Sequence, residues 1–233
     1  MKMLKFGTDS AKYTTGDGDN IVYPFGPPIF QTYVDPNFTK DLISEGRKLT
    51  LKDDDWNHKL AGNLKYGRSY HYKKEFKDKA EPYLKLKVEK FFNAIMDQHG
   101  GKSPMIRRLL TVDKTRMGDD CKTGELKLDA FWINFSQKHD YNPPHNHSGV
   151  LSFVIFCQVP REIFSVQADS NAQRAGNLHF EYGEKITQLM GNEWPVEPFE
   201  HLMFIFPAEL KHFVSPYWVD AERISVSGNF IVI

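Results

Sequence analysis

The sequence has few cysteines and no excess of either charge. Two cysteines, Cys121 and Cys157, are too few to hold 233 residues together by disulfides, so we expect a reduced, intracellular chain. Thirty basic residues balance thirty acidic ones, which leaves no overall field for the phosphate backbone of nucleic acid or for anionic lipid. The first residues lack the apolar stretch of a secretory signal, and no window approaches the length of a membrane helix. These absences predict a cytoplasmic protein with no membrane partner and no strong affinity for nucleic acid.

Internal repeats are also lacking, whereas aromatic residues are abundant. Phe, Tyr and Trp make up 14% of the chain, which favours a β-rich fold with a broad apolar interior. The hydrophobic share of 40% and the charged share of 26% are typical of globular proteins and exclude a disordered chain. The length suits one large domain, so we expect a single domain over residues 1–233.

The pattern of the chain changes near residue 110. Residues 1–110 are expected to form a helical and irregular N-terminal support, with turn-rich chain up to about residue 30. Asp35 and Pro36 predict the start of a short helix. A longer helix is predicted over 77–98, where apolar residues follow the helical period until two glycines end it.

Residues 111–233 have the pattern of strands. Residues 126–134 alternate between inward and outward positions, and four later apolar runs follow without intervening helices, at 150–159, 177–182, 201–206 and 223–233. This spacing predicts an antiparallel sandwich or barrel, and we expect a jelly roll. The fold class is therefore predicted to be α+β, with a jelly-roll core and supporting N-terminal helices.

Two of the nine histidines have the spacing of metal ligands. His145 and His147 are two residues apart in a segment that Pro143 and Pro144 hold extended, so their side chains project to the same side. They either share a metal ion or are a pair of polar loop residues. His212 follows an apolar strand and a turn at Pro207, where a third imidazole can join them.

The last strand has one polar face. Arg223, Ser225, Ser227 and Asn229 alternate with apolar residues or glycine. A buried guanidinium needs an anion, and its planar fork fits a carboxylate. The alternative is that this face lies in solvent.

Three segments, taken in order, resemble the iron(II)- and 2-oxoglutarate-dependent oxygenases, in particular their prolyl-hydroxylase-like group. They are HNHSGV at 145–150, FPAELKHFVSPYW at 206–218 and ERISVSGNF at 222–230. The resemblance covers residues 126–233, and KLAGNLKY at 59–66 is also similar to that group. It identifies the C-terminal half as the catalytic core.

The resemblance implies a double-stranded β-helix that holds Fe(II) through His145 and His212. Arg223 and Ser225 match the pair that grips the distal carboxylate of the small-molecule co-substrate 2-oxoglutarate. The implied reaction consumes O₂, releases succinate and CO₂ and hydroxylates a substrate, with ascorbate as a supporting reductant. Neither the primary substrate nor the oligomeric state follows from the resemblance.

Position 147 departs from the superfamily, most of which has a carboxylate two residues after the first histidine. We expect His147 to be the third ligand, with a carboxylate such as Asp140 as the alternative. Asn134 is assigned to the 2-oxoglutarate site. The candidate pocket residues are Tyr141, Trp132, Ser227 and Asn229, of which Trp132 shares a strand face with Asn134.

Two other functions compete with this interpretation. A cupin-type metal protein without 2-oxoglutarate would need a Glu shortly after His147, but residues 148–152 contain none. A non-enzymatic jelly-roll binding module would make the histidines incidental. We also expect Cys157 to be an inert core residue and the long polar segment within 160–200 to act as a lid.

Overall fold

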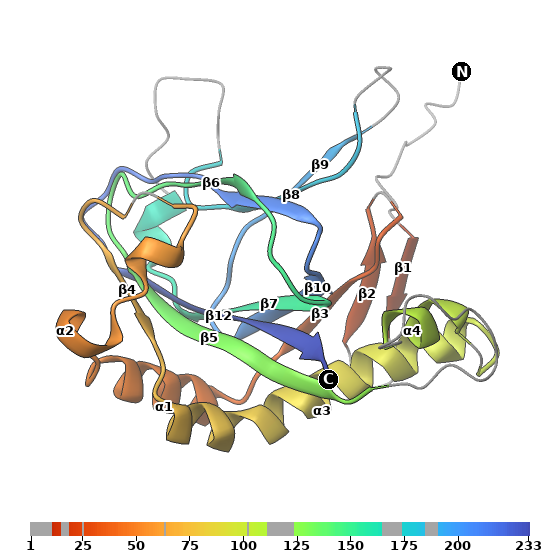
Figure 1. Cartoon of the computed structure of the whole chain (residues 1–233). Helices are drawn as coiled ribbons and strands as arrows, with labels where there is room; N and C mark the ends of the chain where they lie inside the picture. The colour runs from red at the N-terminus through yellow and green to blue at the C-terminus, as the bar shows by residue number, and fades with distance from the viewer. Residues whose placement is uncertain are drawn as a thin grey trace, which may run out of the picture.

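Two antiparallel sheets face each other, and helices cover the outer side of the larger one (Figure 1). The computed structural model describes residues 11–14, 19–24, 26–62, 64–101, 103–110, 124–164, 174–184 and 191–233. This arrangement confirms the predicted α+β fold with a jelly-roll core. No helix in those ranges has the length and apolar character needed to cross a membrane.

The large sheet has eight strands in the order β1-β2-β3-β10-β7-β12-β5-β4. Its strands are β1 (Ala11–Thr14), β2 (Asn20–Tyr23), β3 (Ile29–Tyr33), β4 (Arg68–His71), β5 (Leu126–Ser136), β7 (Leu151–Gln158), β10 (Leu202–Pro207) and β12 (Arg223–Val232). The small sheet has the order β6-β11-β8-β9, with β6 (Asn142–His145), β8 (Leu178–Glu181), β9 (Glu193–Val196) and β11 (Lys211–Val214). The polypeptide therefore crosses repeatedly between two layers, as a jelly roll requires.

The helices lie in the N-terminal half. They are α1 (Pro36–Gly46), α2 (Leu51–Asp54), α3 (Lys74–Gln98) and α4 (Pro104–Leu109), and short 3₁₀ turns occupy Asn57–Lys59 and Arg161–Phe164. The Asp35 side chain accepts a hydrogen bond from the Asn37 backbone N–H, so α1 begins at the predicted cap. Figure 1 shows α1 and α3 beneath the large sheet. They leave its other face free for the small sheet.

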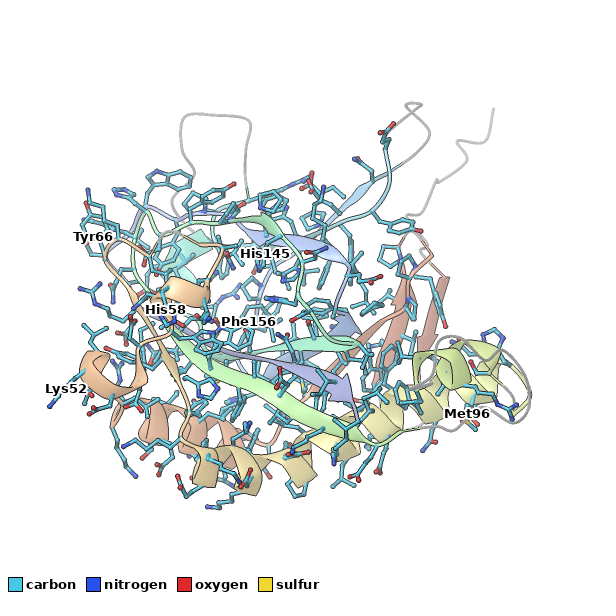
Figure 2. All side chains as sticks on the ribbon, viewed as in Figure 1. Lys52, His58, Tyr66, Met96, His145 and Phe156 are labelled. Atoms are coloured by element: carbon cyan, nitrogen blue, oxygen red, sulfur yellow. The ribbon has the colours of Figure 1, made fainter. Side chains whose placement is uncertain are left out.

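Two apolar clusters follow from this layering. The larger lies between the helices and the large sheet and includes Phe91, Phe131 and Phe230. The smaller lies between the two sheets and is built around Phe180 and Phe204. Figure 2 shows Phe156, another of its members, in the interior together with His145.

The N-terminal segment contains more strand than expected. Helices and irregular chain are expected in residues 1–110, yet β1 to β4 lie between Ala11 and His71 and join the large sheet. The short β2 and β3 lie where glycine and proline predict turns alone. β3 forms its ladder hydrogen bonds with β10, which is distant in the chain, so its short sequence alone does not indicate a strand.

Candidate metal and co-substrate site

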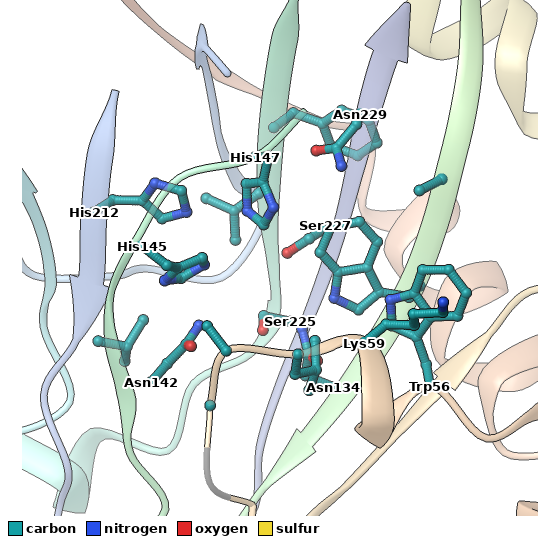
Figure 3. A pocket seen from close by; sticks show the side chains of 18 of the residues that line it. Trp56, Lys59, Asn134, Asn142, His145, His147, His212, Ser225, Ser227 and Asn229 are labelled. Atoms are coloured by element: carbon teal, nitrogen blue, oxygen red, sulfur yellow. The ribbon is translucent and has the colours of Figure 1, made fainter. Parts of the chain in front are cut away.

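Three histidines converge at one end of the small sheet. His145 ends β6 and His212 lies on β11, where the two are direct partners in the strand register, and His147 follows two residues after β6. One ring nitrogen from each of the three lies within 4.8 Å of the others. Figure 3 shows the three rings turned toward a common space. Three imidazoles at this spacing form a donor set suited to a transition-metal ion.

Hydrogen bonds fix which ring nitrogens are free. The Nδ1 atom of His145 lies 2.7 Å from the carbonyl oxygen of Pro143, and that of His212 lies 2.9 Å from the carbonyl oxygen of Leu210. Each Nδ1 therefore carries the proton and donates it, which leaves Nε2 unprotonated and able to bind a cation. The backbone N–H of His147 donates to the carbonyl oxygen of Ala208, 2.9 Å away, and anchors the loop.

Burial keeps all three imidazoles neutral. It lowers the pKa of His147 to about 4 and that of His212 well below its usual value, and the neighbouring His145 adds to both effects. The pKa of His145 is also lowered, chiefly by burial. Neutral rings at pH 7 are in the protonation state that a metal ligand needs.

The histidines open into a cavity of about 460 Å³ between the two sheets. Arg223 lines the same cavity from the first residue of β12 and is only 6% exposed. Its Nη1 atom donates to the carbonyl oxygen of Gly176 at 2.8 Å, whereas its Nε has no partner in the described part of the chain. A buried guanidinium with an unused donor is costly unless an anion enters to accept it.

The polar face of β12 lies in the cavity and not in solvent. Arg223, Ser225, Ser227 and Asn229 all line it, while Ile224, Val226 and Phe230 pack into the core beneath the sheet. The period of two along the strand produces this division. In Figure 3, Ser225 and Asn134 lie on neighbouring strands, and Ser227 and Asn229 continue the polar row.

Two neighbouring side chains are held by hydrogen bonds of their own. The amide oxygen of Asn134 accepts from Ser69 Oγ at 2.9 Å, and that of Asn229 accepts from Ser152 Oγ at 2.9 Å. Both amide NH₂ groups therefore remain available to the cavity. Trp132 also lines the cavity, with its ring centroid 5.6 Å from that of His147.

Asp140 lies outside the histidine cluster. Its buried carboxylate accepts hydrogen bonds from the backbone N–H groups of Tyr66, Gly67 and Gln137 at 3.2, 2.9 and 2.8 Å. These bonds occupy both oxygens, so the carboxylate has a structural role: it acts as a clamp that joins the segment before β4 to the loop after β5. His147 joins the cluster instead.

Tyr141 is not among the cavity's lining residues, and its side chain is 40% exposed. The following residue, Asn142, faces the cavity, and neighbours in extended chain point to opposite sides. The expectations from sequence do not include Asn142, whose Oδ1 is buried without a partner in the described part of the chain. The only sequence signal for its position is the following Pro143, which favours an extended conformation at Asn142.

Residues between Trp56 and Gly62, together with Leu64, form a further wall of the cavity. Gly62 lies against β6 so closely that a Cβ there would be 3.0 Å from Asn142 Oδ1 and 3.1 Å from the carbonyl oxygen of Tyr141. Trp56 and Lys59 from the same segment line the cavity. These residues overlap the KLAGNLKY sequence noted above.

The remaining expectations concern the cysteines and the lid. Cys157 is buried, and burial raises the pKa of its thiol, which makes it unreactive. Cys121 lies outside the described residues, as do parts of the segment expected to be a lid, 165–173 and 185–190. Within that segment, Gly176 and Leu178 adjoin the cavity through Arg223 and the lining.

Comparisons with known proteins agree with this site. Residues 130–229 match the family described as "Putative 2OG-Fe(II) oxygenase". A prolyl-4-hydroxylase from Pseudomonas putida is similar in structure, with 15% identity, a TM-score of 0.51, and coverage of 88% of this chain and 92% of that one. HygX from Streptomyces hygroscopicus, solved with nickel and 2-oxoglutarate bound, has 8% identity, a TM-score of 0.50 and coverage of 88% and 82%.

No curated protein sequence matches the chain. The solved structures establish the shared fold, and the family match covers all three histidines and Arg223. Residues 130–229 of this chain are therefore similar to the putative 2OG-Fe(II) oxygenase family, and the solved structures show that the fold is shared.

Proposed function

We propose that this protein is a dioxygenase that hydroxylates a substrate C–H bond while it converts 2-oxoglutarate and O₂ to succinate and CO₂. His145, His147 and His212 hold the Fe(II), and Arg223, Ser225 and Asn134 hold the co-substrate. The bound metal supplies the redox chemistry with O₂. The observation that supports the proposal most strongly is that the three free imidazole nitrogens share one cavity with a buried, incompletely paired guanidinium.

The cavity separates the two ends of the co-substrate. The histidine cluster takes the 2-oxo acid end, since three protein ligands leave positions for a chelating ligand and for O₂. Arg223 binds the distal carboxylate, which accepts a hydrogen bond from its unused Nε–H, and Ser225 lies two residues along the same strand face. Asn134, on the neighbouring strand β5, contributes its amide NH₂ group. A hydrogen bond from Ser69 Oγ to the amide oxygen of Asn134 fixes the orientation of this side chain.

The protein's own residues also orient the metal ligands. The carbonyl oxygens of Pro143 and Leu210 hold the His145 and His212 rings in the tautomer that presents Nε2. Phe206 packs against His212, with ring centroids 4.9 Å apart, and excludes water from its buried side. These contacts prepare the site before any ligand binds.

The test measures succinate released from 2-oxoglutarate with Fe(II) and O₂. His212→Ala and Arg223→Ala are expected to abolish it, the first by removing a metal ligand and the second by removing the anchor of the co-substrate. His99→Ala is the matched control, because His99 is exposed at the end of α3, away from the cluster. Oxygen-dependent turnover retained in both site variants would overturn the proposal.

Binding measurements separate the two roles. Under anaerobic conditions His212→Ala is expected to lose Fe(II), whereas Arg223→Ala retains Fe(II) and loses 2-oxoglutarate. The visible absorption band of an iron-to-keto-acid complex reports the second step. A band of wild-type strength in Arg223→Ala would show that the guanidinium does not hold the co-substrate.

A further inference from the structure

A short series of aromatic rings leads from the histidine cluster toward the surface. The Trp132 indole lies next to the His147 imidazole, with centroids 5.6 Å apart, and the Trp56 indole lies 6.2 Å from Trp132. Trp132 is 4% exposed, whereas Trp56 is half-buried. Figure 3 shows Trp56 on the side of the cavity opposite His212. The rings of His147, Trp132 and Trp56 therefore form a continuous series of contacts.

Trp56 stands between two hollows of the molecule. It lines the main cavity and also a second depression of about 410 Å³. On the side of the depression its ring is 4.7 Å from that of His71 and 6.4 Å from that of His58, which is exposed. An oxidising equivalent that reaches Trp56 therefore lies on a ring that borders both hollows.

The chemistry of the two rings suits electron transfer. Indole is among the most easily oxidised side chains, and loss of one electron makes its N–H acidic enough to release the proton to water. Neither indole N–H donates a hydrogen bond within the described ranges of the chain, and Trp56, which is half-buried, can release that proton to water. Phenylalanine is far harder to oxidise and cannot serve as such a step.

We propose that Trp132 and Trp56 form a relay that carries oxidising equivalents out of the site when the oxidant forms without a substrate to attack. This function rests on the oxygenase function proposed above. It protects His147 and its neighbours, because oxidative damage moves to Trp56, which is half-buried and also borders the second depression. An oxidant confined to the cavity would otherwise react with the metal ligands themselves.

The electrons balance as follows. Trp132 gives one electron to the oxygen-derived oxidant, Trp56 gives one electron to the Trp132 radical cation, and the Trp56 radical cation releases its indole proton to water. Two such transfers, with two protons from water, reduce the oxidant fully. A one-electron reductant of the ascorbate class repairs the Trp56 radical after each transfer. Without such a reductant Trp56 supplies both electrons, and the doubly oxidised indole adds one water molecule and releases its remaining proton, which gives a hydroxytryptophan.

Trp194 offers an internal control. It is also one ring away from a metal-site histidine, but the intervening ring is Phe180, 6.3 Å from His212 and 5.8 Å from Trp194. The proposed relay predicts that Trp194 is not oxidised, because Phe180 cannot pass an electron, although the ring-to-ring distances along this path resemble those from His147 to Trp56. Trp218, which is 43% exposed, reports any oxidant that diffuses freely.

The experiment incubates the full chain with Fe(II), 2-oxoglutarate and O₂, without primary substrate or reductant and with catalase present. Peptide mass spectrometry then locates the oxygenated tryptophans, and succinate is measured in the same samples. We expect Trp56 to be oxidised several-fold more than Trp194 or Trp218. Trp132→Phe should lower oxidation of Trp56 several-fold, and Trp132→Tyr, which restores an oxidisable ring, should return much of it.

The outcomes distinguish the two proposals. Succinate release with equal oxidation of Trp56 in the wild type and in Trp132→Phe would overturn the relay and leave the oxygenase function intact. Oxidation of Trp218 or Trp194 to the level of Trp56 would do the same, because it would indicate a diffusing oxidant. No succinate and no oxidised tryptophan would overturn both proposals.

Discussion

An imidazole at position 147 changes the charge of the proposed metal site. A carboxylate ligand would neutralise part of a divalent ion, whereas three neutral imidazoles leave its full charge to attract an incoming dianion. The cavity adds Arg223 to this positive field. Residue 147 should therefore affect co-substrate affinity as well as metal binding.

The variant His147→Asp tests this effect. We expect it to bind 2-oxoglutarate more weakly, by about tenfold, or roughly 1.4 kcal/mol, because the added negative charge opposes the dianion. Anaerobic titration of the Fe(II)-loaded protein measures the dissociation constant. His147→Asn is the neutral control, and an affinity of His147→Asp equal to or higher than that of the wild type would refute the electrostatic explanation.

Asp140 should affect stability and not metal binding. Its carboxylate accepts three backbone hydrogen bonds at a buried position, so Asp140→Asn should lower the free energy of unfolding by about 2–4 kcal/mol. Urea denaturation measures this loss, and metal titration should show one Fe(II) site still present. Loss of Fe(II) from a folded Asp140→Asn protein would instead favour the carboxylate as a ligand.

At the scale of elements, the segment before β4 is packed against β5 with no room for a side chain. A Cβ on Gly67 would collide with the carbonyl oxygen of Phe135 and with a carboxylate oxygen of Asp140. The collision is with backbone and with the Asp140 clamp, neither of which can move freely. This contact fixes the N-terminal half against the strand that carries Asn134.

Gly67→Ala is expected to reduce the free energy of unfolding by about 2–4 kcal/mol. Gly191→Ala is the matched control, because a Cβ there meets no atom within 4 Å. Chemical denaturation of the two variants gives the comparison. Equal stabilities would mean that the region around Gly67 relaxes without cost.

At the scale of the whole molecule, several neutral histidines make stability depend on pH. Burial lowers the pKa values of His145, His147 and His212, and also that of His179 on β8. His179 links β8 to its neighbours in the small sheet. Its Nδ1 lies 2.6 Å from Oε1 of Glu193 on β9, and its Nε2 lies 2.8 Å from Ser215 Oγ. Protonation of any of the four opposes the folded state.

The metal-free protein should therefore lose stability on acidification. The unfolded chain binds more protons than the folded one below the ordinary histidine pKa of 6.5, so the loss begins there and, for His147, continues to about pH 4. His147 alone should account for about 2 kcal/mol after allowance for solvent. Urea denaturation at pH 7.5 and at pH 5 measures the effect, and His147→Gln should show a smaller difference. A pH-independent midpoint would contradict it.

Residue patterns in the sequence determined which side chains of the site share a face and predicted the strands of the C-terminal half. The period of two along β12 places Arg223 and Ser225 on one face, and the same period in extended chain pairs His145 with His147, because alternation is a local property of the backbone. Only the tertiary structure decided that this face is enclosed and that His212 meets the pair, since these depend on pairing between β6 and β11. The same reason explains why β2 and β3 were missed, why Tyr141 lies outside the cavity, and why Asp140 binds backbone: each outcome depends on partners distant in the chain.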